Sequence, residues 1–203
     1  MKILVRNSDN VVIYAEPDLA LSADGLRGDG WFSPHFTSAN ATLTEADLPP
    51  NWRGGEWTYV QGVWAAADPI AHAAKVQAAL DAARAALIRQ IDAEADAITR
   101  AKQGDRALEY LLAEEEAQAY KDAGYTGTVP DSVTSWATPN GKSAQWAADD
   151  ILATAVAWRA AQSSIRAARL ACKISASTAT NLEPIVAQWA GFVLAIKTTL
   201  QIS

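Results

Sequence analysis

The sequence changes its pattern abruptly at Asp68-Pro69, and this change constrains the fold more than any other feature. After it comes a long alanine-rich segment whose large apolar residues recur at the spacings of one face of an amphipathic helix. Asp68 is a good N-cap residue, and Pro69 fits the first helical position because an N–H there would have no partner. We therefore expect a helix over about residues 68–101, and domains of residues 1–67 and 68–203. The apolar stripe of this helix comprises Leu80, Leu87, Ile91, Ala95 and Ile98.

Three further segments of the second domain show helical spacing, over about residues 105–123, 144–175 and 179–200. Residues 124–142 contain several glycines and prolines, so we expect a connecting loop there. Amphipathic helices need to bury their apolar faces, which predicts an α-helical bundle, either antiparallel or completed by other copies of the chain. The residues expected on these apolar faces include Leu108, Leu111, Leu112, Ala119 and Tyr120, and then Trp146, Ile151, Ala155, Trp158, Ile165, Cys172 and Trp189.

The first domain has the short alternating pattern of β-strands. Residues 2–15 predict a hairpin, because two β-branched and apolar runs flank the turn-forming residues 7–10. Three glycines in residues 25–30 predict a loop that leads to an aromatic patch. Trp57 and Tyr59 alternate along a strand, Gln61-Gly62 supplies a tight turn, and Trp64 lies on the returning strand. The expected fold class is α+β, a small antiparallel β-module with a tryptophan hairpin followed by a helical bundle.

Composition narrows the classes of partner. The net charge is −6 and the basic residues are dispersed, so the chain lacks the basic stripe that a phosphate backbone requires and nucleic acid is not an expected partner. No stretch approaches the roughly 20 apolar residues of a membrane span, and the start of the chain does not resemble a signal peptide. The single cysteine, Cys172, is compatible with a reducing cytoplasm.

No motif in the sequence predicts catalysis, a metal site or a cofactor. The two histidines, His35 and His72, have no companion at the spacing of a metal site or a nucleophile–base pair, which favours ordinary structural or solvated histidines. Gly141-Lys142-Ser143 resembles the end of a phosphate-binding loop, but Trp136 stands where that motif requires glycine. Glu114-Glu115-Glu116 indicates a solvated helix face rather than a calcium loop. We therefore expect a protein that is not an enzyme.

Aromatic residues are unusually dense in the first domain. Tryptophan and tyrosine side chains anchor protein interfaces and stack on sugars, so they are the candidates for partner binding. The candidate residues are Trp31, Trp52, Trp57, Tyr59 and Trp64. In the helical domain, the spacing of Trp158 and Trp189 among other apolar residues predicts core packing instead.

The order of these features resembles accessory proteins encoded beside tail-fibre genes in tailed bacteriophages, including the tail-fibre assembly family. The resemblance lies in Ile3–Tyr14, Pro49-Pro50, the hairpin Trp57–Trp64 and the long helix that follows Asp68. The helical part is also similar to small phage tail proteins through Tyr110–Ala117, Trp158 and Ile165–Arg169, although it is longer than in the assembly chaperones.

The resemblance implies a protein that binds a tail-fibre or baseplate protein. It would act either as a structural part of the virion tail or as a chaperone in the host cytoplasm during assembly. The aromatic patch and residues 25–30 leave a second hypothesis open, a carbohydrate- or receptor-binding module at a fibre tip.

Overall fold

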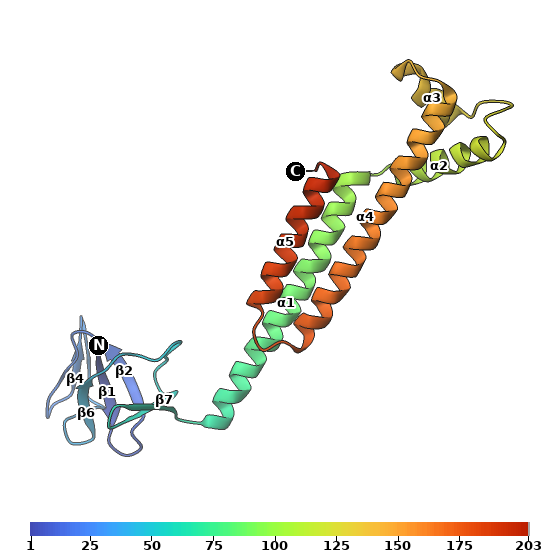
Figure 1. Ribbon diagram of the computed structural model, residues 1–203. Coiled ribbons are helices and arrows are strands. Elements are labelled where there is room, and N and C mark those ends of the chain that lie inside the picture. The colour runs from blue at the N-terminus through green and yellow to red at the C-terminus, as the bar shows by residue number, and fades with distance from the viewer. Residues whose placement is uncertain (203) are drawn as a thin grey trace. The chain divides into compact units, whose positions relative to one another are not determined.

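The computed structural model describes residues 1–202 and confirms the α+β class, with small antiparallel sheets in residues 2–66 and five helices in residues 69–200 (Figure 1). The chain forms two compact units, Met1–Ala79 and Leu80–Ser203. The first unit thus includes the start of the long helix α1 (Pro69–Gln103). Asp68 caps this helix as expected, since its Oδ1 accepts hydrogen bonds from the N–H groups of Ile70 at 3.0 Å and Ala71 at 2.9 Å.

The main sheet of the first unit has the strand order β2-β1-β6. The predicted hairpin of residues 2–15 is confirmed as β1 (Lys2–Arg6) paired with β2 (Val12–Glu16), and β6 (Ala41–Glu45) covers the other edge of β1. Because successive side chains of a strand point to opposite faces, the central strand β1 is buried on both sides. Leu4 packs in one cluster with Leu19 and Leu26, while Ile3 and Val5 pack with Val12 in the other.

The tryptophan hairpin is also confirmed, as β7 (Trp57–Val60) and β8 (Val63–Ala66). Gln61 has φ of 49° and Gly62 has φ of 88°, the pair of positive values that a two-residue type I′ turn requires. Tyr59 lies opposite Trp64 in the register, and their ring centroids are 4.9 Å apart.

The prediction of a loop over residues 25–30 is wrong for Leu26–Gly28, which form the central strand of a small sheet of order β3-β4-β5, while Asp29 and Gly30 form a turn. Its strands are β3 (Ala20–Leu21), β4 (Leu26–Gly28) and β5 (Trp31–Ser33). The glycines are there because a Cβ on Gly28 would lie 2.3 Å from the Trp31 ring, and one on Gly25 would lie 2.4 Å from the Phe32 ring. Gly25 and Gly28 therefore leave room for aromatic rings.

The prediction of a continuous loop over residues 124–142 is also wrong, because the helix α3 (Asp131–Asn140) lies within this range. The helix-breaking residues lie at the two ends of α3. Pro130 precedes the first turn, Pro139 lies in the last turn, and Gly141 ends the helix with a left-handed φ of 61°. Proline disrupts the interior of a helix far more than its ends, so the prolines and glycine here delimit a short helix.

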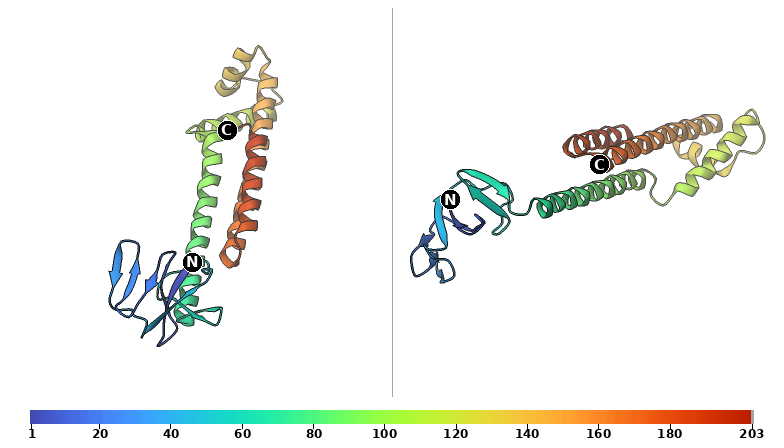
Figure 2. Two further views of the ribbon diagram at one scale, coloured as in Figure 1. Left: turned by 90° about the vertical axis from the view of Figure 1, so that its left-hand side faces the viewer. Right: turned by 90° about the horizontal axis from the view of Figure 1, so that it is seen from below.

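The other three helices are α2 (Ala107–Asp122), α4 (Ala144–Thr178) and α5 (Glu183–Leu200). Ser143 caps α4 as expected, accepting a hydrogen bond from the Trp146 N–H at 3.1 Å. The 35-residue helix α4 serves two separate cores. Its first part packs with α2 and α3, while its second part runs beside α1 and α5 in all views (Figures 1 and 2).

Candidate functional site

Trp31 is held within the first unit by contacts on several sides. Its Nε1 donates to Glu16 Oε2 at 3.2 Å, and its ring lies 5.0 Å from that of Tyr14. The ring also lies against Gly28, which is opposite Trp31 in the register of β4 and β5. Trp31 is therefore half-buried, and its ring supports the joint between the two three-stranded sheets.

Trp52, Tyr59 and Trp64 form a second group. All three are half-buried against the cluster of Ile3, Val5 and Val12, on the opposite side of the main sheet from Trp31. The hairpin is tied to this sheet by the Tyr59 N–H, which donates to the Asn10 carbonyl at 3.0 Å. Burial of these rings fixes the hairpin on the sheet.

Trp57 belongs to neither group. Its ring contacts His72 in the first turns of α1, edge to face, with centroids 5.0 Å apart. Lys75 Nζ pairs with Glu56 Oε1 at 2.6 Å beside it. His72 thus contacts Trp57 within the unit Met1–Ala79.

The five candidate aromatic residues therefore do not form one exposed patch. Among the residues that the structure describes, the Nε1 atoms of Trp52 and Trp57 are buried without a hydrogen-bond partner. The apolar side chains that are exposed in this unit include Phe32 and the two valines that flank the hairpin turn, Val60 and Val63. Sequence reasoning missed the valines, although their position beside a two-residue turn is a signal of exposure.

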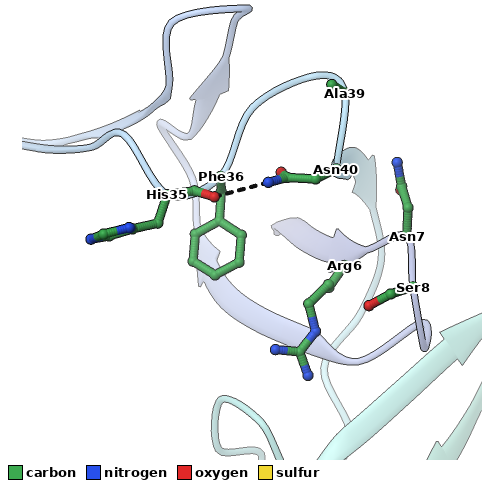
Figure 3. Close-up of a pocket in the computed structure, with 7 residues that line it drawn as sticks. All are labelled: Arg6, Asn7, Ser8, His35, Phe36, Ala39 and Asn40. Carbon is green, nitrogen blue, oxygen red and sulfur yellow. Dashed lines mark hydrogen bonds between the residues drawn. The ribbon is translucent and has the colours of Figure 1, made fainter.

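A hollow of about 530 Å³ lies beside the turn between β1 and β2 (Figure 3). The Phe36 ring and the Arg6 side chain line it, whereas the His35 side chain points away from the others drawn. Asn40 shapes its wall, donating from Nδ2 to the His35 carbonyl at 2.9 Å and accepting from the Thr37 N–H at 2.8 Å.

Arg6 is already paired at this hollow. Its Nη2 lies 2.6 Å from Asp9 Oδ2, and this hydrogen bond raises the pKa of Arg6 and lowers the pKa of Asp9. The hollow thus combines one aromatic ring, a guanidinium that stays charged and the amide of Asn7.

Trp189 lies in the helical core, as the sequence predicts. It is fully buried, and its Nε1 donates to Glu94 Oε2 at 2.7 Å, which joins α5 to α1. Trp158 is half-buried against the same cluster, and its Nε1 is buried without a partner among the described residues. Cys172 is buried there too, and burial raises the pKa of its thiol. It is therefore not a reactive nucleophile.

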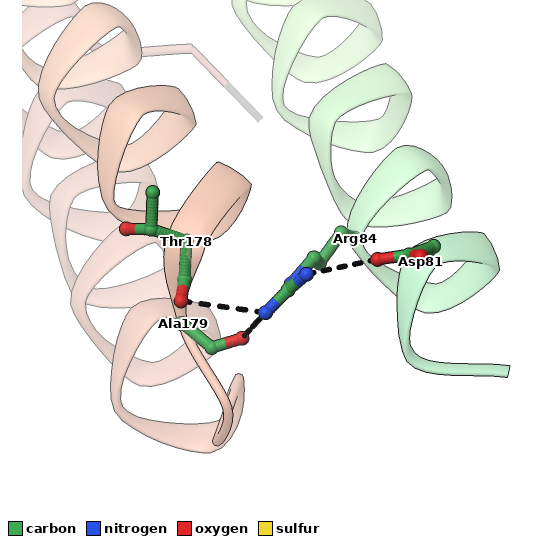
Figure 4. Close-up of polar contacts among 4 residues, drawn as sticks. All are labelled: Asp81, Arg84, Thr178 and Ala179. Atoms are coloured by element: carbon green, nitrogen blue, oxygen red, sulfur yellow. Dashed lines mark hydrogen bonds and ion pairs between the residues drawn. The ribbon is translucent and has the colours of Figure 1, made fainter. Parts of the chain in front are cut away.

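The end of α4 is fixed to α1 by one arginine (Figure 4). Arg84 donates to the carbonyl oxygens of Ala179 at 2.8 Å and Thr178 at 3.3 Å, and pairs with Asp81 at 2.8 Å. The last carbonyls of a helix have no partner within it, and a cation there also complements the helix dipole. This arginine is structural, and it fixes the register of α1 against α4.

Of the apolar stripe expected on residues 105–123, only Tyr120 is buried, and it packs with Ala117 against α3 and α4. The expected residues Leu108, Leu111, Leu112 and Ala119 are exposed. Leu108 has 81% of its surface accessible. Trp146, expected on the buried face of α4, is exposed as well, because the alanines that follow it, Ala147 and Ala148, pack in the core instead.

Over residues 1–202, the structure brings together no group of three histidine, cysteine or acidic side chains that would hold a metal ion. No described helix is long and apolar enough to cross a membrane. No protein-family model, curated protein or solved structure matches the chain.

Proposed function

We propose that the protein is a non-enzymatic component of a bacteriophage tail, which binds a tail-fibre or baseplate protein as a part of the virion or as an assembly factor. The phage context comes from the resemblance of the β-module and the long helix to accessory proteins of tail fibres. The observation that carries the binding role is the leucine face of α2, formed by Leu108, Leu111 and Leu112.

The leucine face has the form of a helix that docks into a groove of another protein. Positions i, i+3 and i+4 lie on one side of a helix, and three leucines there are the anchors of that binding mode. Glu109 and Glu115 flank them, so the groove that fits best is apolar with a basic rim. In the β-module, Val60 and Val63 provide a smaller contact beside the paired rings of Tyr59 and Trp64.

Mass spectrometry of purified virions of the encoding phage tests this function. A stoichiometric amount of the chain in virions identifies a structural part, located in the tail. Absence from virions together with co-purification with the fibre in the host cytoplasm identifies an assembly factor. Absence from both refutes the proposal.

A second candidate, glycan binding at a fibre tip, is favoured by the hollow of Figure 3. An aromatic ring with a guanidinium and an amide beside it suits the apolar and hydroxyl faces of a sugar. Binding of the intact chain to a glycan array would be the readout. Ala39→Arg fills the hollow from its rim without removing a hydrogen-bonding side chain, so a glycan signal that survives this change would exclude the hollow as its source.

A further inference from the structure

The three helices around Trp189 differ in the faces that they turn away from their shared core. On α1, the exposed positions include Arg89, Asp96 and Arg100, as expected for a helix that faces water. Along one side of α4 and in the middle of α5, the exposed residues are uncharged. A helix that is apolar or small on all sides is normally buried.

On α4, the uncharged face is a regular stripe opposite the buried Ile165 and Cys172. Its members recur at alternating spacings of four and three, the pattern of a helix that packs against another helix. They are Val156, Ala160, Ser163, Ala167, Leu170 and Ile174, all exposed.

The charges of this part of α4 lie along one edge. Arg159, Arg169 and Lys173 are paired there within the chain, to Glu114 on α2 and to Asp92 on α1, and Arg166 is exposed on the same edge. The stripe itself therefore carries no charge that needs water.

On α5, the outward face is also small and apolar, with Ala187, Ala190, Gly191 and Leu194 exposed. The charged residues of this 18-residue helix, Glu183 and Lys197, lie in the same row at its two ends, four residues before Ala187 and three after Leu194. A groove of about 540 Å³ joins it to α4, with Ala160 and Ser164 on one wall and Ala195 and Thr199 on the other. Small residues along such a groove allow another helix to approach closely.

The chain exposes more surface than two compact domains of its size would. The chain exposes 12636 Å². Two separate compact domains with the sizes of the two units would together expose about 11,000 Å² by the usual scaling of surface with mass. The excess of about 1,600 Å² belongs to the chain as a whole, and it is large enough to include an interface of the size that permanent homo-oligomers bury per partner, about 1,000 to 2,500 Å².

We propose that the outer faces of α4 and α5 form a permanent interface with a second copy of the chain. In a two-fold interface the same patch meets itself, so a patch of one sign would repel its copy, whereas the α4 stripe is uncharged and the α5 face carries one acid and one base, Glu183 and Lys197, at opposite ends. Val156, Leu170, Ile174 and Leu194 supply the large side chains, and the alanines and the groove supply the spaces between them. This inference goes beyond the proposed function and does not depend on it.

Sedimentation equilibrium of the purified full chain tests the interface. The wild-type protein should have at least twice the chain mass of 21.6 kDa at micromolar concentration. Ile174→Glu and Leu194→Glu should each bring the mass down toward 21.6 kDa, because a carboxylate in the interface would be buried without a partner. Both positions are 70% exposed in the single chain, so far-UV circular dichroism should not change.

Ile70→Glu is the matched control, because Ile70 is an exposed isoleucine on a helix of the other unit. It should keep the wild-type mass. If Ile174→Glu loses helix signal, Ile174→Gln replaces it, with a weaker but measurable shift toward the single chain. A wild-type mass of 21.6 kDa at all concentrations overturns the inference, and so does a wild-type mass retained by both folded variants. The virion experiment is independent of either result.

Discussion

Replacing Ile91 with alanine should strongly destabilise the helical unit. Ile91 lies at the centre of the core between α1, α4 and α5 and has 0% of its surface exposed. The change removes three buried carbons, worth about 2.4 kcal/mol in transfer free energy. The cavity adds roughly 1 kcal/mol, and the better helix propensity of alanine returns about 0.4 kcal/mol. The expected loss in the free energy of unfolding is about 3 kcal/mol.

Ile70→Ala provides the matched comparison, since Ile70 is in the same helix and 84% exposed. Its free energy of unfolding should stay within about 0.5 kcal/mol of the wild-type value. Urea unfolding followed by circular dichroism at a single protein concentration measures both variants. If Ile91→Ala lost less than about 1 kcal/mol, or no more than Ile70→Ala, the assignment of the core between α1, α4 and α5 would be wrong.

Three other changes have defined outcomes. Trp189→Phe removes the hydrogen bond to Glu94 and should lower the free energy of unfolding by about 1–3 kcal/mol in urea titrations. Asp68→Ala removes the cap of α1 and should cost about 1 kcal/mol, visible as a lower melting temperature of the first unit. The hydrogen bond from Lys121 lowers the pKa of Asp149 in the folded state, so its stabilisation is present above the unfolded value of about 3.9 and is lost as the pH falls further. Asp149→Asn should therefore flatten the dependence of melting temperature on pH in acid, and an unchanged slope would contradict the role of this pair.

The elements that the sequence predicts correctly depend on contacts between near neighbours in the chain. Asp68 and Ser143 cap helices by binding N–H groups two or three residues away, and Gln61-Gly62 closes a two-residue turn. The burial of Ile91 and Trp189 follows from a helical spacing sustained over many residues. These local patterns do not depend on the rest of the fold.

The errors arise where distant residues decide the role of a local signal. In the sequence, Gly25 and Gly28 resemble loop residues. In the structure, the rings of Phe32 and Trp31 occupy the space beside them, so a side chain larger than hydrogen would not fit. The candidate aromatic residues look like one patch because they are close in sequence, and Trp57 and Tyr59, two residues apart, share one side of their strand. Their contacts differ because Tyr59 lies opposite Trp64 and packs with it on the core of the main sheet, whereas Trp57 lies opposite the small Ala66 and contacts His72 in α1.

The remaining difference between prediction and structure is an apolar helix face that is exposed instead of buried, and such a face indicates a binding partner. One rule, apolar residues at helical spacing, predicts burial for Ile91 and for Leu108, yet the first is fully buried and the second is 81% exposed. The rule detects a face that needs a partner and does not specify whether that partner lies in the same chain. The acidic rim of the leucine face favours a partner with a basic rim, whereas the uncharged stripe of α4, and the face of α5 with one acid and one base at its ends, are compatible with a second copy of the chain. The chain thus has two kinds of uncovered face, and their difference in charge predicts two different partners.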